Sequence, residues 1–115
     1  MKIAVCAGEK SGDALGHELI VDLKENIENL EVIGVGGPLM EGEGLKSFFP
    51  IKEISYMGLI DPLLNLRKIL KLRKNFINFL KKENPDVFIG IDSPSFNSGI
   101  CKALRRDTNI KTVQY

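Results

Sequence analysis

The chain has 115 residues, of which 43% are hydrophobic and 27% are charged, and its formal net charge is +1. This length is enough for one small domain with an apolar core. A net charge so close to zero gives no reason to expect nucleic acid as a partner. The two cysteines, Cys6 and Cys101, lack the spacing of metal ligands, so we interpret them as reduced packing residues of a cytosolic protein and expect no metal.

The first predicted strand is Lys2–Ala7, an apolar run too short for a secretory signal or a membrane span. The glycine-containing loop after it opens an amphipathic helix at Gly12–Asn26, with Ser11 as the predicted N-cap. His17 falls in this helix, and we expect it to have a structural or solvent-facing role.

The middle of the chain continues the alternation of strands and helices. A strand is predicted at Glu31–Val35, followed by a short helix at Leu39–Glu43 that ends at Gly44. A weak strand, interrupted by a proline, is predicted at Phe48–Ile54. Pro62 suits the first turn of a long helix that reaches about Glu83.

The last part of the chain predicts a buried strand at Asp86–Ile91, a helix at Asn97–Arg106 and a strand that starts at Lys111. This alternation predicts an α/β fold, a Rossmann-like parallel sheet with helices on both faces. Because the sequence stops inside a predicted strand, we expect the chain to be a fragment of a longer protein.

Three loops follow predicted strands and should meet at the carboxyl edge of the sheet, where ligands bind in such folds. They are Gly8–Asp13, residues 34–38 and residues 90–97. Each loop is a weak signal by itself. The first lacks the phosphate-loop pattern, and the second lacks the full dinucleotide pattern and serves equally well as a packing turn.

Asp92 is the sharpest candidate because it follows the buried strand directly. Its carboxylate could cap the next helix together with Ser93 and Ser95, or it could act as a general base, and the residues leave both roles open. Glu9 and Asp13 are the other carboxylates near this edge, and Asp13 also favours the first turn of its helix electrostatically.

The predicted helix that starts at Pro62 carries an asymmetric charge. Seven basic residues and no acidic residue lie between Pro62 and Lys82, whereas the rest of the chain holds nine basic and fifteen acidic residues. A wide apolar face accompanies them, which suits an anionic membrane surface but also a core helix with a solvated basic face. Contact with nucleic acid is a weaker third interpretation, since stacking aromatic residues are scarce there. An exposed apolar helix could also mediate a homodimer.

Four blocks, residues 7–16, 34–40, 57–58 and 85–97, occur in an order that strongly resembles the N-terminal part of the lipid-A-disaccharide synthase family. The resemblance covers essentially the whole chain, and residues 111–115 are similar to the family's next strand. It implies a glycosyltransferase with two Rossmann-like domains, the B architecture. Residues 1–115 would form the incomplete, acceptor-side N-terminal domain, and the C-terminal nucleotide-sugar domain would be absent from this chain.

The family transfers 2,3-diacylglucosamine from its UDP donor to 2,3-diacylglucosamine 1-phosphate, which gives a β-1,6-linked lipid A disaccharide 1-phosphate and UDP. The resemblance implies inversion at the anomeric carbon, no cofactor, and no essential metal. Since most UDP contacts of the family lie in the missing domain, we expect this chain alone to be inactive.

The resemblance also implies site residues, with Asp92 as the base. Substrate binding is expected at Gly8, Glu9, Ser11, Gly12, Asp13, Gly36, Gly37, Met57 and Asn97. Contact with the cytoplasmic face of the bacterial inner membrane, as a peripheral protein, is expected at Ile60, Leu63, Leu66, Arg67, Lys68, Ile69, Leu70 and Lys71.

Two positions depart from the family pattern. Ser95 stands where a second aspartate is usual, which removes one negative neighbour of Asp92, and Asp61-Pro62 replaces a Glu-Val pair. Two other functions stay open from the sequence. One is a non-catalytic α/β module that binds an anionic ligand or a membrane, and the other is a different glycosyltransferase or epimerase that acts on UDP-sugars.

Overall fold

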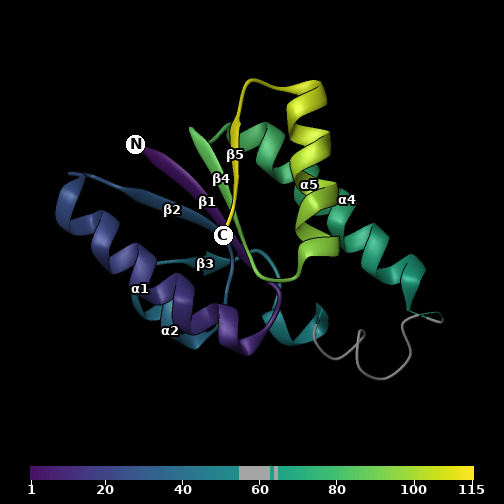
Figure 1. Ribbon diagram of the computed structural model, residues 1–115, viewed down its shortest axis with the longest axis horizontal. Helices are drawn as coiled ribbons and strands as arrows, with labels where there is room; N and C mark the ends of the chain where they lie inside the picture. The colour runs from purple at the N-terminus through teal and green to yellow at the C-terminus, as the bar shows by residue number, and fades with distance from the viewer. Residues whose placement is uncertain (55–62, 64) are drawn as a thin grey trace.

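The computed structural model describes residues 1–54, 63 and 65–115. Met57 and Ile60, two of the predicted site residues, and Pro62, the predicted helix start, lie outside the described residues. Five parallel strands form one sheet in the order β3-β2-β1-β4-β5 (Figure 1). The strands are β1 (Lys2–Ala7), β2 (Glu31–Val35), β3 (Lys46–Ser47), β4 (Val87–Ile91) and β5 (Lys111–Gln114).

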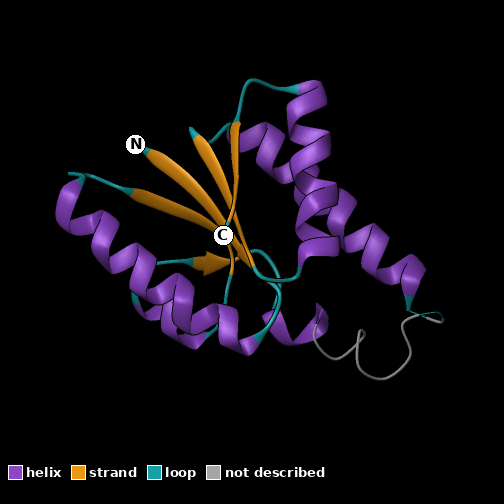
Figure 2. Ribbon diagram, in the orientation of Figure 1, coloured by secondary structure: helices purple, strands orange, loops and turns teal. Residues whose placement is uncertain are grey.

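Helices cover both faces of the sheet, which confirms the predicted fold class (Figure 2). On one side lie α1 (Lys10–Asn26) and α2 (Pro38–Gly42), and on the other lie α4 (Leu66–Glu83) and α5 (Pro94–Asp107). Alternate side chains of β1 enter two separate apolar clusters, as the two-residue period of a strand requires. Ala4 and Cys6 face the cluster of α4 and α5, whereas Ile3 and Val5 face the cluster that contains Ile20 of α1.

Aromatic rings fill the side of the sheet that α4 and α5 cover. Phe76 and Phe88 are fully buried there, and Phe49 and Phe96 are nearly so. Phe48 stacks on Phe79 with ring centroids 4.5 Å apart. Cys6 and Cys101 are free and buried in the same cluster. Burial raises the pKa of both thiols, so they are packing groups and not reactive thiolates, as the sequence predicted.

The strand predicted at Phe48–Ile54 is wrong. The ladder ends at Ser47, with one further bond from the Phe48 amide to the Gly34 carbonyl at 2.8 Å, and residues 51–54 are helical. Pro50 has no N–H to donate to a ladder, and the Phe49 ring turns into the aromatic cluster. The strand-like sequence pattern of Phe48–Ile54 therefore reflects burial of the Phe49 ring and not hydrogen-bonded pairing in the sheet.

Two helix starts also differ from the prediction: α5 begins at Pro94 and not at Asn97, and α1 begins at Lys10 and not at Gly12. The N-cap of α1 is Glu9, so Ser11 lies within the first turn and does not cap the helix. The Asp13 amide already donates to the Glu9 carbonyl at 3.2 Å, which starts the helix earlier than Gly12. The end of α4 at Glu83, just before Asn84 and Pro85, agrees with the prediction, and the structure adds that Asn84 has a left-handed conformation.

The Asp13 carboxylate joins the start of α1 to the start of α2. Its side chain is only 3% exposed and accepts hydrogen bonds from the amides of Gly37, Leu39 and Met40 at 2.9, 3.0 and 3.1 Å. These amides belong to the first turn of α2 and the residue before it, where free N–H groups favour a negative charge. His17, one turn further along α1, is partly exposed, and its Nδ1 lies 3.2 Å from the Leu39 carbonyl oxygen, an arrangement that fits the expected structural or solvent-facing role.

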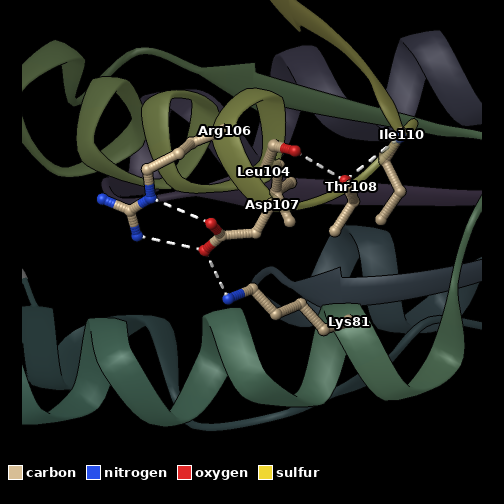
Figure 3. Close-up of polar contacts among 6 residues, drawn as sticks. All are labelled: Lys81, Leu104, Arg106, Asp107, Thr108 and Ile110. Carbon is tan, nitrogen blue, oxygen red and sulfur yellow. Dashed lines mark hydrogen bonds and ion pairs between the residues drawn. The ribbon is translucent and has the colours of Figure 1, made fainter.

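A network of polar contacts joins the ends of α4 and α5 (Figure 3). The Asp107 carboxylate accepts hydrogen bonds from Arg106 at 2.9 and 3.0 Å and from Lys81 of α4 at 2.7 Å. These donors hold the pKa of Asp107 well below its usual range. Beyond it, the Thr108 hydroxyl donates to the Leu104 carbonyl at 2.6 Å and accepts from the Ile110 amide, which leads the chain into β5.

We expect Asp13→Asn to destabilise the fold by about 2–4 kcal/mol, because the amide cannot accept all three bonds and buries an unpaired donor. Urea unfolding should show a lower midpoint with an unchanged slope. Glu41→Gln, on the exposed side of α2, is the matched control and should leave the midpoint unchanged. An unchanged midpoint in Asp13→Asn would contradict the structural role of this carboxylate.

Asp107→Asn should lower the melting temperature at pH 7, and the difference from the wild type should shrink in acid. Because the pKa of Asp107 is lowered in the folded state, its contribution is present above the unfolded pKa of about 4 and is lost as the pH falls below that value. Thermal melts between about pH 2 and pH 7 measure this. Asp22→Asn, an exposed carboxylate of α1, should show no such difference, and a wild-type advantage that persists undiminished near pH 2 would refute the expectation.

Candidate functional site

The loops after β1 and β4 meet at the carboxyl edge of the sheet, as the topology predicts. Gly8 lies so close to Ser93 that a Cβ atom at Gly8 would collide with the Ser93 hydroxyl. The loop after β2 is held to the first helix by Asp13, which binds the Gly37 amide. All three predicted segments therefore converge on one edge of the sheet, and the convergence depends on close backbone approach.

The turn between β4 and α5 has an unusual backbone. Asp92 and Ser93 both have positive φ, 51° and 43°, which residues other than glycine seldom adopt. Two such residues in succession store strain that the surroundings must overcome, and this is a frequent feature of functional sites. The Asp92 amide donates to the Tyr115 carbonyl at 3.3 Å, and Gln114 Nε2 donates to the Asp92 carbonyl at 3.3 Å.

The structure does not favour Asp92 as a cap of α5. Ser93 is the N-cap residue, and its side chain makes no capping hydrogen bond. Among the residues that the structure describes, none donates a hydrogen bond to the Asp92 carboxylate, although the side chain is half-buried. Asp92 therefore lies at the carboxyl edge of the sheet, where ligands bind in such folds, without serving as a cap.

Asn97 is completely buried beneath this turn. Its Nδ2 lies 2.8 Å from the Asp92 carbonyl oxygen and 3.3 Å from the carbonyl oxygens of Cys6 and Ile91. The side chain therefore contacts the protein's own main chain and is closed to a ligand. The predicted substrate contact by Asn97 is replaced by a supporting role, because no part of the residue reaches the surface.

The other predicted substrate-binding residues divide by exposure. Glu9 and Ser11 are exposed in the first turn of α1 and beside it. The other described members of the set are buried: Gly8, Gly12, Asp13, Gly36 and Gly37. The glycines could contact a ligand only through their main chain. The Asp13 carboxylate is bonded to amides of the α2 region.

The first half of α4 presents the predicted membrane-contact residues. Leu63 before the helix is 86% exposed, and Leu66 and Leu70 are 49% and 41% exposed. Three basic residues of this segment are also exposed: Arg67, Lys68 and Lys71. Ile69 differs, because it is half-buried and packs against the aromatic cluster, so that only part of the residue is left for the predicted membrane contact.

Arg73 and Gln114 contact the turn between β4 and α5 and its neighbourhood, and the sequence did not predict either contact. Arg73 turns inward from α4, lies against Gly99 of α5 and donates to the Ser95 carbonyl at 3.4 Å. In the sequence Arg73 is indistinguishable from its exposed basic neighbours, and the only signal is the glycine at position 99 that gives it room. Gln114 had no signal, since its contact with Asp92 depends on strand pairing between β4 and β5.

A separate hollow of about 690 Å³ lies away from this edge, beside β2 and β3 and the end of α4. It holds none of the predicted site residues. Among the described residues, no group of three or more His, Cys, Asp or Glu side chains is placed to hold a metal ion. Within the same part of the chain, no helix combines the length and the apolar character needed to cross a membrane.

Comparison with known proteins identifies the family. A family model described as lipid-A-disaccharide synthetase matches residues 3–115. The chain is 53% identical over 115 residues to the lipid-A-disaccharide synthase of Pseudomonas fluorescens strain Pf0-1 and 50% identical over 115 residues to that of Pseudomonas syringae pv. tomato. In both cases all of the chain is aligned, and it spans 30% of the relative's length. The chain belongs to the lipid-A-disaccharide synthase family.

Proposed function

We propose that this chain is the acceptor-side domain of a lipid-A-disaccharide synthase, an inverting glycosyltransferase. The observation that carries the proposal is the strained turn of Asp92 at the ligand edge of the sheet, in a chain that shares about half of its residues with such enzymes. The proposed donor is UDP-2,3-diacylglucosamine, and the proposed acceptor is 2,3-diacylglucosamine 1-phosphate. Contacts to UDP would come from sequence outside these 115 residues.

The proposed reaction is a single displacement at the anomeric carbon of the donor. The 6-hydroxyl oxygen of the acceptor forms the new bond to that carbon, while the bond to the β-phosphate oxygen breaks and UDP leaves. Asp92 takes the hydroxyl proton, which increases the nucleophilicity of the acceptor oxygen. Inversion follows from one displacement, so no covalent sugar–enzyme intermediate is needed.

Side chains that reach solvent at the same edge are suited to hold the acceptor. Glu9 can accept hydrogen bonds from sugar hydroxyls, and Ser11 can both donate and accept. Gly8, Gly12, Gly36 and Gly37 would contribute their main chain, since small residues permit close approach of a ligand. Asp13 supports the site from beneath through its three bonds to the α2 region.

The first half of α4 is the proposed contact with the cytoplasmic face of the inner membrane. Exposed leucines at positions 63, 66 and 70 lie among exposed cations, a combination suited to the interface of an anionic bilayer. Both substrates carry acyl chains, so a peripheral position would bring the site to its lipids. Self-association through the same apolar residues, giving a homodimer, is the competing use of this surface.

The 115 residues alone should give no disaccharide when supplied with donor and acceptor. A chimera in which they replace the matching segment of the Pseudomonas fluorescens relative should form it. In the chimera, Asp92→Asn should lower kcat by about 10²–10⁴-fold, because the base is lost. Product is measured by chromatography of the labelled lipid.

Asp22→Asn, exposed on α1, is the matched control and should retain the rate of the chimera. Turnover by the isolated 115 residues would contradict the division of the site between two domains. A folded chimera without turnover would favour the non-catalytic binding module, and full turnover in Asp92→Asn would remove Asp92 from the mechanism.

Lys68→Gln combined with Lys71→Gln should reduce binding to vesicles that contain phosphatidylglycerol by about 25-fold, since each cation near an anionic surface contributes about 1 kcal/mol. Sedimentation with vesicles measures the effect, which should disappear at high salt. The matched control is Lys102→Gln combined with Lys111→Gln, two exposed lysines outside α4. Equal binding by both double variants would refute the proposed membrane contact of α4. Concentration-dependent self-association that is lost in Leu66→Gln would assign this surface to a homodimer.

A further inference from the structure

We infer that Asn97 is a positioning residue that acts on the reaction through Asp92. The inference rests on the proposed role of Asp92 as the base. Asn97 lies in the first turns of α5, five residues after Asp92, and is 0% exposed. It cannot touch a substrate, so any effect on chemistry must pass through the residues that it contacts.

Three carbonyl oxygens surround the Asn97 amide nitrogen. The Asp92 carbonyl is nearest at 2.8 Å, and those of Cys6 and Ile91 lie at 3.3 Å. Cys6 and Ile91 are at the carboxyl ends of β1 and β4, neighbouring strands in the sheet. One side chain therefore joins the ends of the two central strands to the carbonyl of the residue that would carry the base.

The orientation of this amide is fixed by its surroundings. Rotating it by half a turn would bring Oδ1 against three carbonyl oxygens, which repel it. In the observed orientation Oδ1 is buried with no hydrogen-bond partner among the described residues. An unpaired buried acceptor is unfavourable, and a leucine of similar size would avoid it. The donors of Nδ2, and not the volume of the side chain, therefore account for an asparagine at this position.

The hydrogen bonds from Asn97 Nδ2 hold the left-handed turn formed by Asp92 and Ser93. Asp92 and Ser93 keep positive φ values only while their surroundings compensate for the strain. The bond from Asn97 is the shortest side-chain contact to the Asp92 main chain, and Gln114 adds a longer one at 3.3 Å. Without the amide the turn can relax to ordinary φ values, which would displace the Asp92 carboxylate from the acceptor hydroxyl.

The test is a double-mutant cycle in the chimera with the Pseudomonas fluorescens relative, with Asn97→Leu, Asp92→Asn and both together. We expect Asn97→Leu to lower kcat by about 10–100-fold while KM for donor and acceptor stays within about twofold, as misplacement of a reacting group predicts. In the Asp92→Asn background Asn97→Leu should have no further effect on the residual rate, since residues that act through one group are not additive. Asn26→Leu, which removes an exposed amide of α1, is the matched control.

Three outcomes would overturn the inference. Wild-type kcat in Asn97→Leu, together with a lowered kcat in Asp92→Asn, would overturn the positioning role of Asn97 and retain Asp92 as the base. An equal further loss in the double variant would show a merely structural effect. Wild-type turnover in Asp92→Asn would overturn the base assignment and the inference together. If Asn97→Leu does not fold, Gln114→Leu, which removes the longer contact to the same carbonyl, should show the same non-additivity with a smaller loss.

Discussion

The burial of β1 on both edges and both faces is the constraint on which the rest of the structure depends. It pairs with β2 on one side and β4 on the other, and its side chains from Ile3 to Ala7 are at most 1% exposed. Fixing this strand fixes where its two neighbours, β2 and β4, end, because parallel pairing sets their register. The three loops that form the candidate site therefore start from positions that the core determines.

The carboxyl edge is built mostly from main chain and from polar side chains turned inward. Asp13 and Asn97 are the two buried polar residues of the described core, and each satisfies backbone groups of a different loop. Asp13 serves amides at the start of α2, and Asn97 serves carbonyls at the ends of β1 and β4. A buried carboxylate pairs with donors and a buried amide with acceptors, so each loop is held by the chemistry that its free groups require.

The sequence was sufficient for β1, β2, β4 and β5 and insufficient for the edge strand β3 and for the details of the carboxyl edge. Continuous apolar runs predicted β1 and β2 with the observed bounds, because burial on both faces leaves a strong signal. Phe48–Ile54 misled because one ring enters the core from a segment that Pro50 excludes from the ladder. For Asn97 and Asp13 the residues of the site were found but their roles were not, since a polar residue after a strand has the same pattern whether it faces a ligand or the protein's own backbone.

The two faces of α4 connect the proposed membrane surface to the proposed base. Outward, the helix presents Leu66, Leu70 and exposed cations; inward, Phe76 and Leu80 anchor it in the core. Arg73 lies between these faces and contacts the first turn of α5 at Ser95, three residues after Asp92. The guanidinium lies where a Cβ atom at position 99 would stand, so the absence of a side chain at Gly99 gives Arg73 room at this contact between α4 and α5. This contact between α4 and the first turn of α5 therefore relates the proposed membrane surface to the turn that carries the proposed base.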